Sequence, residues 1–218
     1  MDSRTPAPQS RKRTVVILAV GMLLLTLFAV LAVGVKRRAL FVETDVLCRD
    51  VLHDHATAMP EVAAVFAGIT ALGSRWVIWA EGAAVLLALF GLRKWRAALL
   101  WGLSFAGYFA VPLFKLWIDR ARPVFAVPIV KETSASFPSG HAVGSAIVFG
   151  MLAYLLIRAA PRRWLMAVTF SGSLIALIGF SRVYLGAHWL SDVVAGLAFG
   201  LGWVALWVAV AEARSLKR

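Results

Sequence analysis

Three short segments of the sequence carry side chains suited to chemistry on a phosphate group. Lys115 and Arg122 stand in the run KLWIDRARP, and Arg182 stands in the run SRVYLGAHWLSD. All three are cations, and the two guanidinium groups have the planar fork that matches phosphate oxygens. A single cation at the end of an apolar segment is usually a snorkelling anchor. Because charge at membrane depth is costly, three such cations indicate function if the fold brings them together.

The run PSGH predicts an anion site built from backbone. Ser139, Gly140 and His141 stand directly before an apolar segment, where a helix is expected to begin. Free N–H groups and the helix dipole favour an anion at such a position. Glycine lets the backbone approach a bound group closely. His141 adds an imidazole that can donate a proton.

His188 and Asp192 are the candidates for a nucleophile and the carboxylate that orients it. They are four residues apart, so they share one face if a helix begins there. A carboxylate on one ring nitrogen fixes the tautomer and leaves the other nitrogen free as nucleophile or base. The combined set describes a phosphoryl-transfer site that requires no metal, and we predict no cofactor.

Other polar residues are interpreted as structural. His53 and His55 could suggest metal ligation, but their i, i+2 spacing points them to opposite faces of a strand. No further His or Cys stands nearby, so we interpret this part of the polar segment 37–60 as a plain loop. The charged residues beside the motifs are interpreted as surface groups: Asp119 and Arg120 as a local pair, Lys131 and Glu132 as solvated loop.

Six apolar segments predict the helices that would position these groups. A span needs about 20 mostly apolar residues. The weakest segment contains Glu81, and a five-span chain is the main alternative. The shorter segment 60–72 predicts an interfacial or re-entrant helix. The predicted spans are 15–35, 75–92, 97–114, 137–157, 164–181 and 193–211.

Composition and charge agree with a membrane protein. Of 218 residues, 61% are hydrophobic and 16% charged, which leaves too little polar surface for a soluble domain. The net charge of +12 suits either nucleic acid or an anionic membrane. More than half of the 23 Lys and Arg fall on the side of both termini, including the tail 1–14. The positive-inside rule therefore predicts cytoplasmic termini and an extracytoplasmic site, and it leaves no role for nucleic acid. The only cysteine, Cys48, excludes an intrachain disulfide.

Taken in order, the three segments resemble the signature of the type 2 phosphatidic acid phosphatase superfamily. The resemblance runs from about residue 75 to 211, and all signature positions match. One departure is Leu190, where relatives commonly have proline. Soluble vanadium haloperoxidases share the signature, but six spans argue against that branch. The resemblance implies an all-α, six-helix integral membrane bundle, a single phosphatase domain over 1–218, with its site at the extracytoplasmic ends of spans three to six.

The resemblance also implies roles for the motif residues. His188 would attack phosphorus, Asp192 would orient it, and His141 would protonate the leaving group and then activate water. The chain would hydrolyse a lipid phosphate monoester or pyrophosphate, such as a polyprenyl diphosphate, phosphatidylglycerophosphate or phosphatidate, without a divalent metal. The alternatives are a lipid phosphotransferase using the same phosphohistidine, a small membrane transporter, and a binding protein without catalysis. The residues that would hold the phosphate oxygens are Lys115, Arg122, Ser139, Gly140 and Arg182.

Overall fold

The structure is a computed structural model that describes residues 8–38 and 42–215. In this part of the chain every regular element is helical, which confirms the predicted all-α class. Two short 3-10 turns, Ala106–Phe109 and Pro161–Arg163, join longer helices. The α-helices are α1 (Pro8–Lys36), α2 (Val42–Ala58), α3 (Pro60–Ala71), α4 (Arg75–Gly91), α5 (Trp95–Phe105), α6 (Ala110–Ile118), α7 (Gly140–Ala159), α8 (Trp164–Tyr184) and α9 (Leu190–Ser215).

The predicted spans correspond to these helices. Among the described residues, five helical segments are long and apolar enough to cross a bilayer, with α5 and α6 forming one of them. The pair α3 and α4 would make a sixth, but it is bent by 41° at the break between the two helices. This bent pair contains the predicted short helix 60–72 and the weakest predicted span. The fold therefore has the helices expected of a six-helix membrane bundle.

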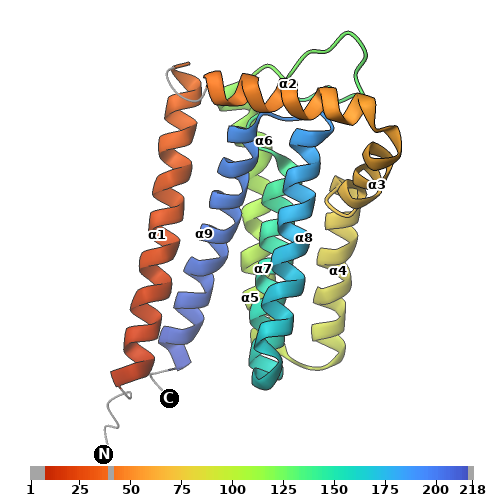
Figure 1. Cartoon of the computed structure of the whole chain (residues 1–218). Coiled ribbons are helices and arrows are strands. Elements are labelled where there is room, and N and C mark those ends of the chain that lie inside the picture. Colours follow the sequence, from red (N-terminus) through yellow and green to blue (C-terminus); the bar gives the residue numbers. More distant parts are fainter. Residues whose placement is uncertain (1–7, 39–41, 216–218) are drawn as a thin grey trace, which may run out of the picture.

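Helix α7 lies at the centre of the bundle. It contacts both α8 and α9, and α1 packs along the outer side of α9 (Figure 1). Small residues allow this close approach, because a Cβ on Gly196 or Gly200 would meet α7 at 2.9 or 2.6 Å. The first half of α7 is buried on every side, from Ala142 to Phe149.

The segment 37–60, interpreted as a plain loop, contains a helix. Figure 1 shows α2 lying across one end of the bundle, roughly perpendicular to the spans. Glu43 and Asp45 stand in its first turn, where the helix dipole favours acidic groups. The loop interpretation of His53 and His55 is therefore wrong. His53 stacks on Phe125 at 3.5 Å between ring centroids, and His55 Nδ1 lies 2.9 Å from the Tyr184 hydroxyl.

The start of α1 and the end of α9 lie at the same end of the bundle, opposite α2 (Figure 1). Helix α1 begins at Pro8, so half of the predicted basic tail 1–14 is helical. Residues 1–7 of that tail, and the basic residues Lys217 and Arg218, lie outside the described residues.

Candidate active site

The three signature segments meet at the end of the bundle that α2 covers. Lys115 is in the last turn of α6, and Arg182 is in the last turn of α8. Gly140 and His141 begin α7, after Ser139. Arg122 comes from the long connection between α6 and α7. His188 lies in the turn before α9, and Asp192 lies in the first turn of α9.

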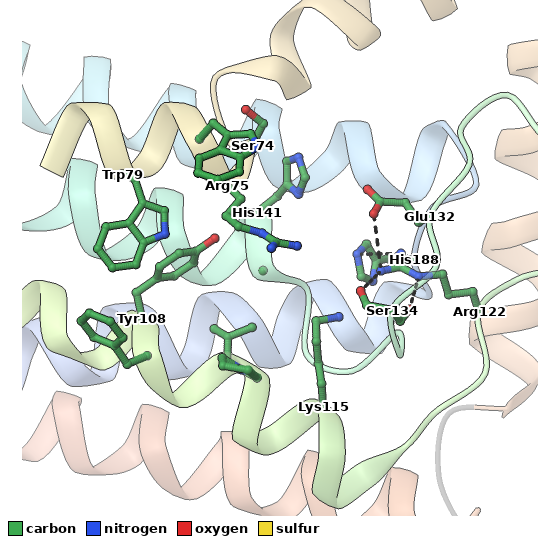
Figure 2. A pocket seen from close by; sticks show the side chains of 15 residues that line it. Ser74, Arg75, Trp79, Tyr108, Lys115, Arg122, Glu132, Ser134, His141 and His188 are labelled. Carbon is green, nitrogen blue, oxygen red and sulfur yellow. Dashed lines mark hydrogen bonds and ion pairs between the residues drawn. The ribbon is translucent and has the colours of Figure 1, made fainter.

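A cavity of about 750 Å³ opens among these elements. Lys115, Arg122, Gly140, His141 and His188 line it, and Figure 2 shows the side chains of Lys115, Arg122, His141 and His188 around it. The cavity then continues toward the break between α3 and α4. That part of the wall is formed by Ser74, Arg75, Trp76, Trp79, Tyr108, Phe109, Val111 and Pro112.

The contacts of His188 assign its two ring nitrogens. Arg122 Nη1 lies 3.1 Å from Nε2, and a guanidinium can only donate, so Nε2 carries the lone pair. Nδ1 lies 3.4 Å from Asp192 Oδ2, which accepts a hydrogen bond from the Nδ1–H group. The same Oδ2 accepts the Ser136 hydroxyl and the Trp189 N–H. Nε2 therefore faces the cations and the cavity, while Nδ1 faces the carboxylate.

His188 is buried, and burial lowers its pKa to about 4 because the charged ring is poorly solvated there. Asp192 opposes this effect by raising the pKa, and Arg122 and Arg182 lower it further. The imidazole is therefore neutral near pH 7, and its Nε2 lone pair accepts from Arg122 Nη1.

Ser139 does not line the cavity. Its side chain is buried and its hydroxyl accepts the Ala142 N–H at 3.4 Å, so it caps α7. Its own N–H donates to the Asp192 carbonyl at 3.1 Å. Ser139 thus joins the start of α7 to the start of α9, and the backbone of Gly140 stands at the cavity instead.

Glu132 lies in an exposed loop, as interpreted, but its carboxylate also stands between two of the predicted phosphate-binding cations. Its Oε1 accepts Arg182 Nη2 at 2.6 Å. Its Oε2 is 3.9 Å from Arg122 Nη2 (Figure 2). Burial alone raises the pKa of Glu132, but Arg182 and Arg122 outweigh it and hold the pKa below its ordinary value. Arg182 is 1% exposed, donates from Nη1 to Thr70 at 3.2 Å, and has no hydrogen-bond partner for its Nε among the described residues.

Arg120 is not a surface partner of Asp119. Its Nη1 donates to Asp192 Oδ1 at 2.5 Å and its Nη2 donates to Asp45 Oδ2 at 2.6 Å. Asp119 instead ends α6 in a left-handed conformation, with φ of 50°. The partners of Arg120 are 72 and 75 residues away in sequence, so no local pattern predicts these pairs.

Two further features complete the site. Lys115 Nζ donates to the Ala135 carbonyl, which ties the end of α6 to the connection before α7. Across the described ranges 8–38 and 42–215, no group of three or more His, Cys, Asp or Glu side chains is placed to hold a metal ion.

Comparisons with known proteins show the family to which the chain belongs. A sequence model described as the PAP2 superfamily matches residues 95–215, more than half of the chain. The chain is 37% identical over 146 residues to phosphatidylglycerophosphatase B of Bacillus subtilis (strain 168), covering 65% of this chain and 71% of that protein. It is 36% identical over 74 residues to an undecaprenyl-diphosphatase of Sulfolobus acidocaldarius, covering 34% of this chain and 32% of that one.

A solved structure is also similar. The crystal structure of a transmembrane PAP2 type phosphatidylglycerolphosphate phosphatase from Bacillus subtilis superposes with a TM-score of 0.79 at 30% identity. The match covers 88% of this chain and 96% of that one. The predicted resemblance is therefore confirmed: the chain belongs to the PAP2 superfamily, as a multi-pass membrane lipid phosphatase of the PAP2 type.

Proposed function

We propose that this phosphatase hydrolyses a lipid phosphate monoester or pyrophosphate through a phosphohistidine on His188. Asp192 orients the ring, and His141 exchanges protons with the leaving group and with water. The phosphate oxygens are held by Lys115, Arg122 and Arg182, by the backbone of Gly140, and by the start of α7 that Ser139 caps.

The observation that carries the proposal is the orientation of His188. Its Nε2 lies 3.1 Å from Arg122 Nη1, while its Nδ1 is turned to Asp192. A substrate phosphate that takes over this Arg122 donor would lie next to the Nε2 lone pair. This is the arrangement that an in-line attack by nitrogen needs.

The reaction balances with the residues present. In the first step Nε2 forms a bond to phosphorus, the bond from phosphorus to the leaving oxygen breaks, and His141 gives that oxygen a proton. In the second step His141 takes a proton from water, the hydroxide attacks phosphorus, and the P–N bond breaks to release phosphate. The cations and helix start stabilise the equatorial oxygens in both transition states.

The shape of the cavity supports a lipid substrate. From the cations it continues to Arg75, Trp76, Trp79 and Phe109 beside α4 and the 3-10 turn before α6. Trp76 is 79% and Phe109 is 56% exposed, as expected of residues that face lipid or the membrane interface. Phosphatidylglycerophosphate is the first substrate to test, because two relatives that each match well over half of this chain are named for it. Polyprenyl diphosphate and phosphatidate are the next substrates to test.

The activity test uses full-length protein, purified in detergent with EDTA and assayed for phosphate release. We expect the His188→Ala variant to lose activity and to form no phosphoenzyme, while a matched His55→Ala variant keeps the wild-type rate. A near-wild-type rate for His188→Ala would overturn the nucleophile assignment. Transfer of phosphate to an added alcohol in preference to water would replace hydrolysis with phosphotransfer.

We also propose that the site faces the extracytoplasmic side and that both termini are cytoplasmic, from the distribution of Lys and Arg. Single cysteines in a Cys48→Ala background test this orientation. Val127→Cys lies in the connection beside the site and is 74% exposed in the wild type, and Ala160→Cys lies at the opposite end. We expect an impermeant thiol reagent outside intact cells to label only Val127→Cys. The reverse pattern would invert the topology.

A further inference from the structure

Helix α2 places one buried carboxylate, that of Asp45, against the start of α9. Asp45 is 2% exposed, and its Oδ1 accepts the Ser191 N–H at 2.9 Å. Its Oδ2 accepts the Ser191 hydroxyl at 2.6 Å. An anion at a helix N-terminus is favourable, so Asp45 fixes the first turn of α9, which carries Asp192.

Arg120 joins this carboxylate to Asp192. One guanidinium nitrogen donates to Asp45, and the other donates to both Asp192 Oδ1 and the Ser191 hydroxyl at 2.7 Å. The guanidinium also lies over the Trp189 ring, with 5.2 Å to the centroid. The planar fork is thus held on two carboxylates and one aromatic face.

The two oxygens of Asp192 are consequently divided. Oδ1 is occupied by Arg120, and Oδ2 is left for His188, Ser136 and the Trp189 N–H. Both oxygens belong to one rigid carboxylate group. A contact that holds Oδ1 therefore also limits the direction in which Oδ2 can point. Arg120 therefore orients the Asp192 carboxylate, and this carboxylate in turn orients the ring of His188.

We propose that Asp45 and Arg120 are positioning residues for the nucleophile, acting through Asp192, and that α2 is the element that supplies this function. The proposal rests on the proposed role of His188. Four groups contact one another in a row: Asp45, Arg120, Asp192 and the ring of His188. When Nε2 is phosphorylated and Nδ1 keeps its proton, the ring is positive, so the charges alternate and sum to zero.

Two observations favour this role over a purely structural tie. Asp45 and Asp192 are both buried, and a buried ionic set is a weak source of stability that apolar residues can replace. In addition, Arg120 donates hydrogen bonds to Ser191 in the first turn of α9 and to Asp192, the residue that contacts His188. Asp45 lies outside the matched residues 95–215, so the PAP2 sequence pattern does not include it.

The test compares Asp45→Asn, Arg120→Lys and Arg120→Gln with wild type. Asparagine keeps an oxygen for the Ser191 N–H but removes the charge, and lysine keeps the charge but cannot fork between two carboxylates. We expect kcat to fall about 10-fold for Asp45→Asn and about 100-fold for Arg120→Gln, with Arg120→Lys between them. KM and the inhibition constant of inorganic phosphate should stay within about 2-fold, because the phosphate-binding cations are untouched.

The matched control is Asp50→Asn, which makes the same change on α2 at a carboxylate whose side chain is 51% exposed. It should leave kcat unchanged. The double variant Asp45→Asn/Arg120→Gln should be clearly non-additive, since both changes act on one row of contacts. Thermal unfolding of each variant identifies any that fail to fold, and Arg120→Lys remains as the mildest change.

The outcomes separate this proposal from the proposed function. If His188→Ala is inactive but Asp45→Asn and Arg120→Lys keep the wild-type kcat, the positioning role is wrong and the nucleophile stands. If phosphate inhibition weakens in parallel with kcat, the two residues hold the site together without positioning, and the proposal also fails. If His188→Ala is active, the nucleophile assignment falls first.

Discussion

Glu132 lies between Arg182 and Arg122, the two guanidinium groups proposed to hold phosphate, and this predicts that removing its charge tightens phosphate binding. Its carboxylate contacts Arg182 at 2.6 Å and stands 3.9 Å from Arg122. A substrate phosphate must displace this carboxylate before it can use both cations. We therefore expect Glu132→Gln, which removes a charge from the site, to bind phosphate more tightly.

The magnitude follows from the contacts that are lost. A hydrogen bond to a charged group contributes about 1.5–3 kcal/mol. The Glu132 side chain is 31% exposed and its second contact is long, so solvent reduces this to about 1–2 kcal/mol. Since 1.4 kcal/mol is a factor of ten, the inhibition constant of inorganic phosphate should fall about 5- to 30-fold.

The assay measures inhibition of lipid phosphate hydrolysis by inorganic phosphate at pH 7, where the lowered pKa of Glu132 keeps the wild-type carboxylate ionised. Asp119→Asn is the control, because it removes an exposed acidic residue from the other end of the same connection. It should leave the inhibition constant unchanged. Weaker phosphate binding in Glu132→Gln would refute the reasoning and show instead that Glu132 orients Arg182 for the substrate.

Three further predictions concern stability, positioning and pH. A Cβ on Gly200 would lie 2.6 Å from a side chain of α7, so Gly200→Ala should destabilise the protein by about 1–3 kcal/mol. Gly172→Ala is the control: a Cβ at this position would meet no atom within 4 Å, so the melting temperature should not fall. Ser136→Ala removes a donor to Asp192 and should lower kcat about 10-fold with little change in KM, whereas Ser145→Ala, whose hydroxyl bonds only within its own helix, should not. The pKa of His188 is lowered to about 4 by burial, so kcat/KM, corrected for ionisation of the substrate, should be lost as the pH falls through about 4; a loss centred near pH 6.5 would contradict the burial argument.

The spans and the signature residues were predictable because their signals are local. A run of about 20 apolar residues predicts a membrane helix without any knowledge of its neighbours. His188 and Asp192 are only four residues apart, and the turn before α9 together with its first turn brings the two side chains to 3.4 Å. The sequence also predicts a separate helix before α4, since the segment 60–72 is apolar but too short to span a membrane.

The remainder depends on contacts across the chain. Helix α2 is rich in charged and polar residues, as a loop would be, and it is held in place by burial of residues such as Asp45 against α9. Arg120 and Glu132 look like surface groups because their partners are 50–75 residues distant. Ser136 belongs to no motif, and only the fold brings it to Asp192. In each case a polar or charged side chain finds its partner through tertiary structure alone.

The wall of the cavity between the cations and Trp76 has a consequence for how the enzyme meets its substrate. This part of the wall is formed at the side of the bundle by α4 and the turn before α6, among residues exposed there. A lipid can then keep its chains in the bilayer while its headgroup moves sideways into the site. Encounter takes place in two dimensions, and the governing concentration is the mole fraction of substrate at the surface. Diluting the substrate with inert lipid or detergent should therefore slow the reaction, even when its bulk concentration is unchanged.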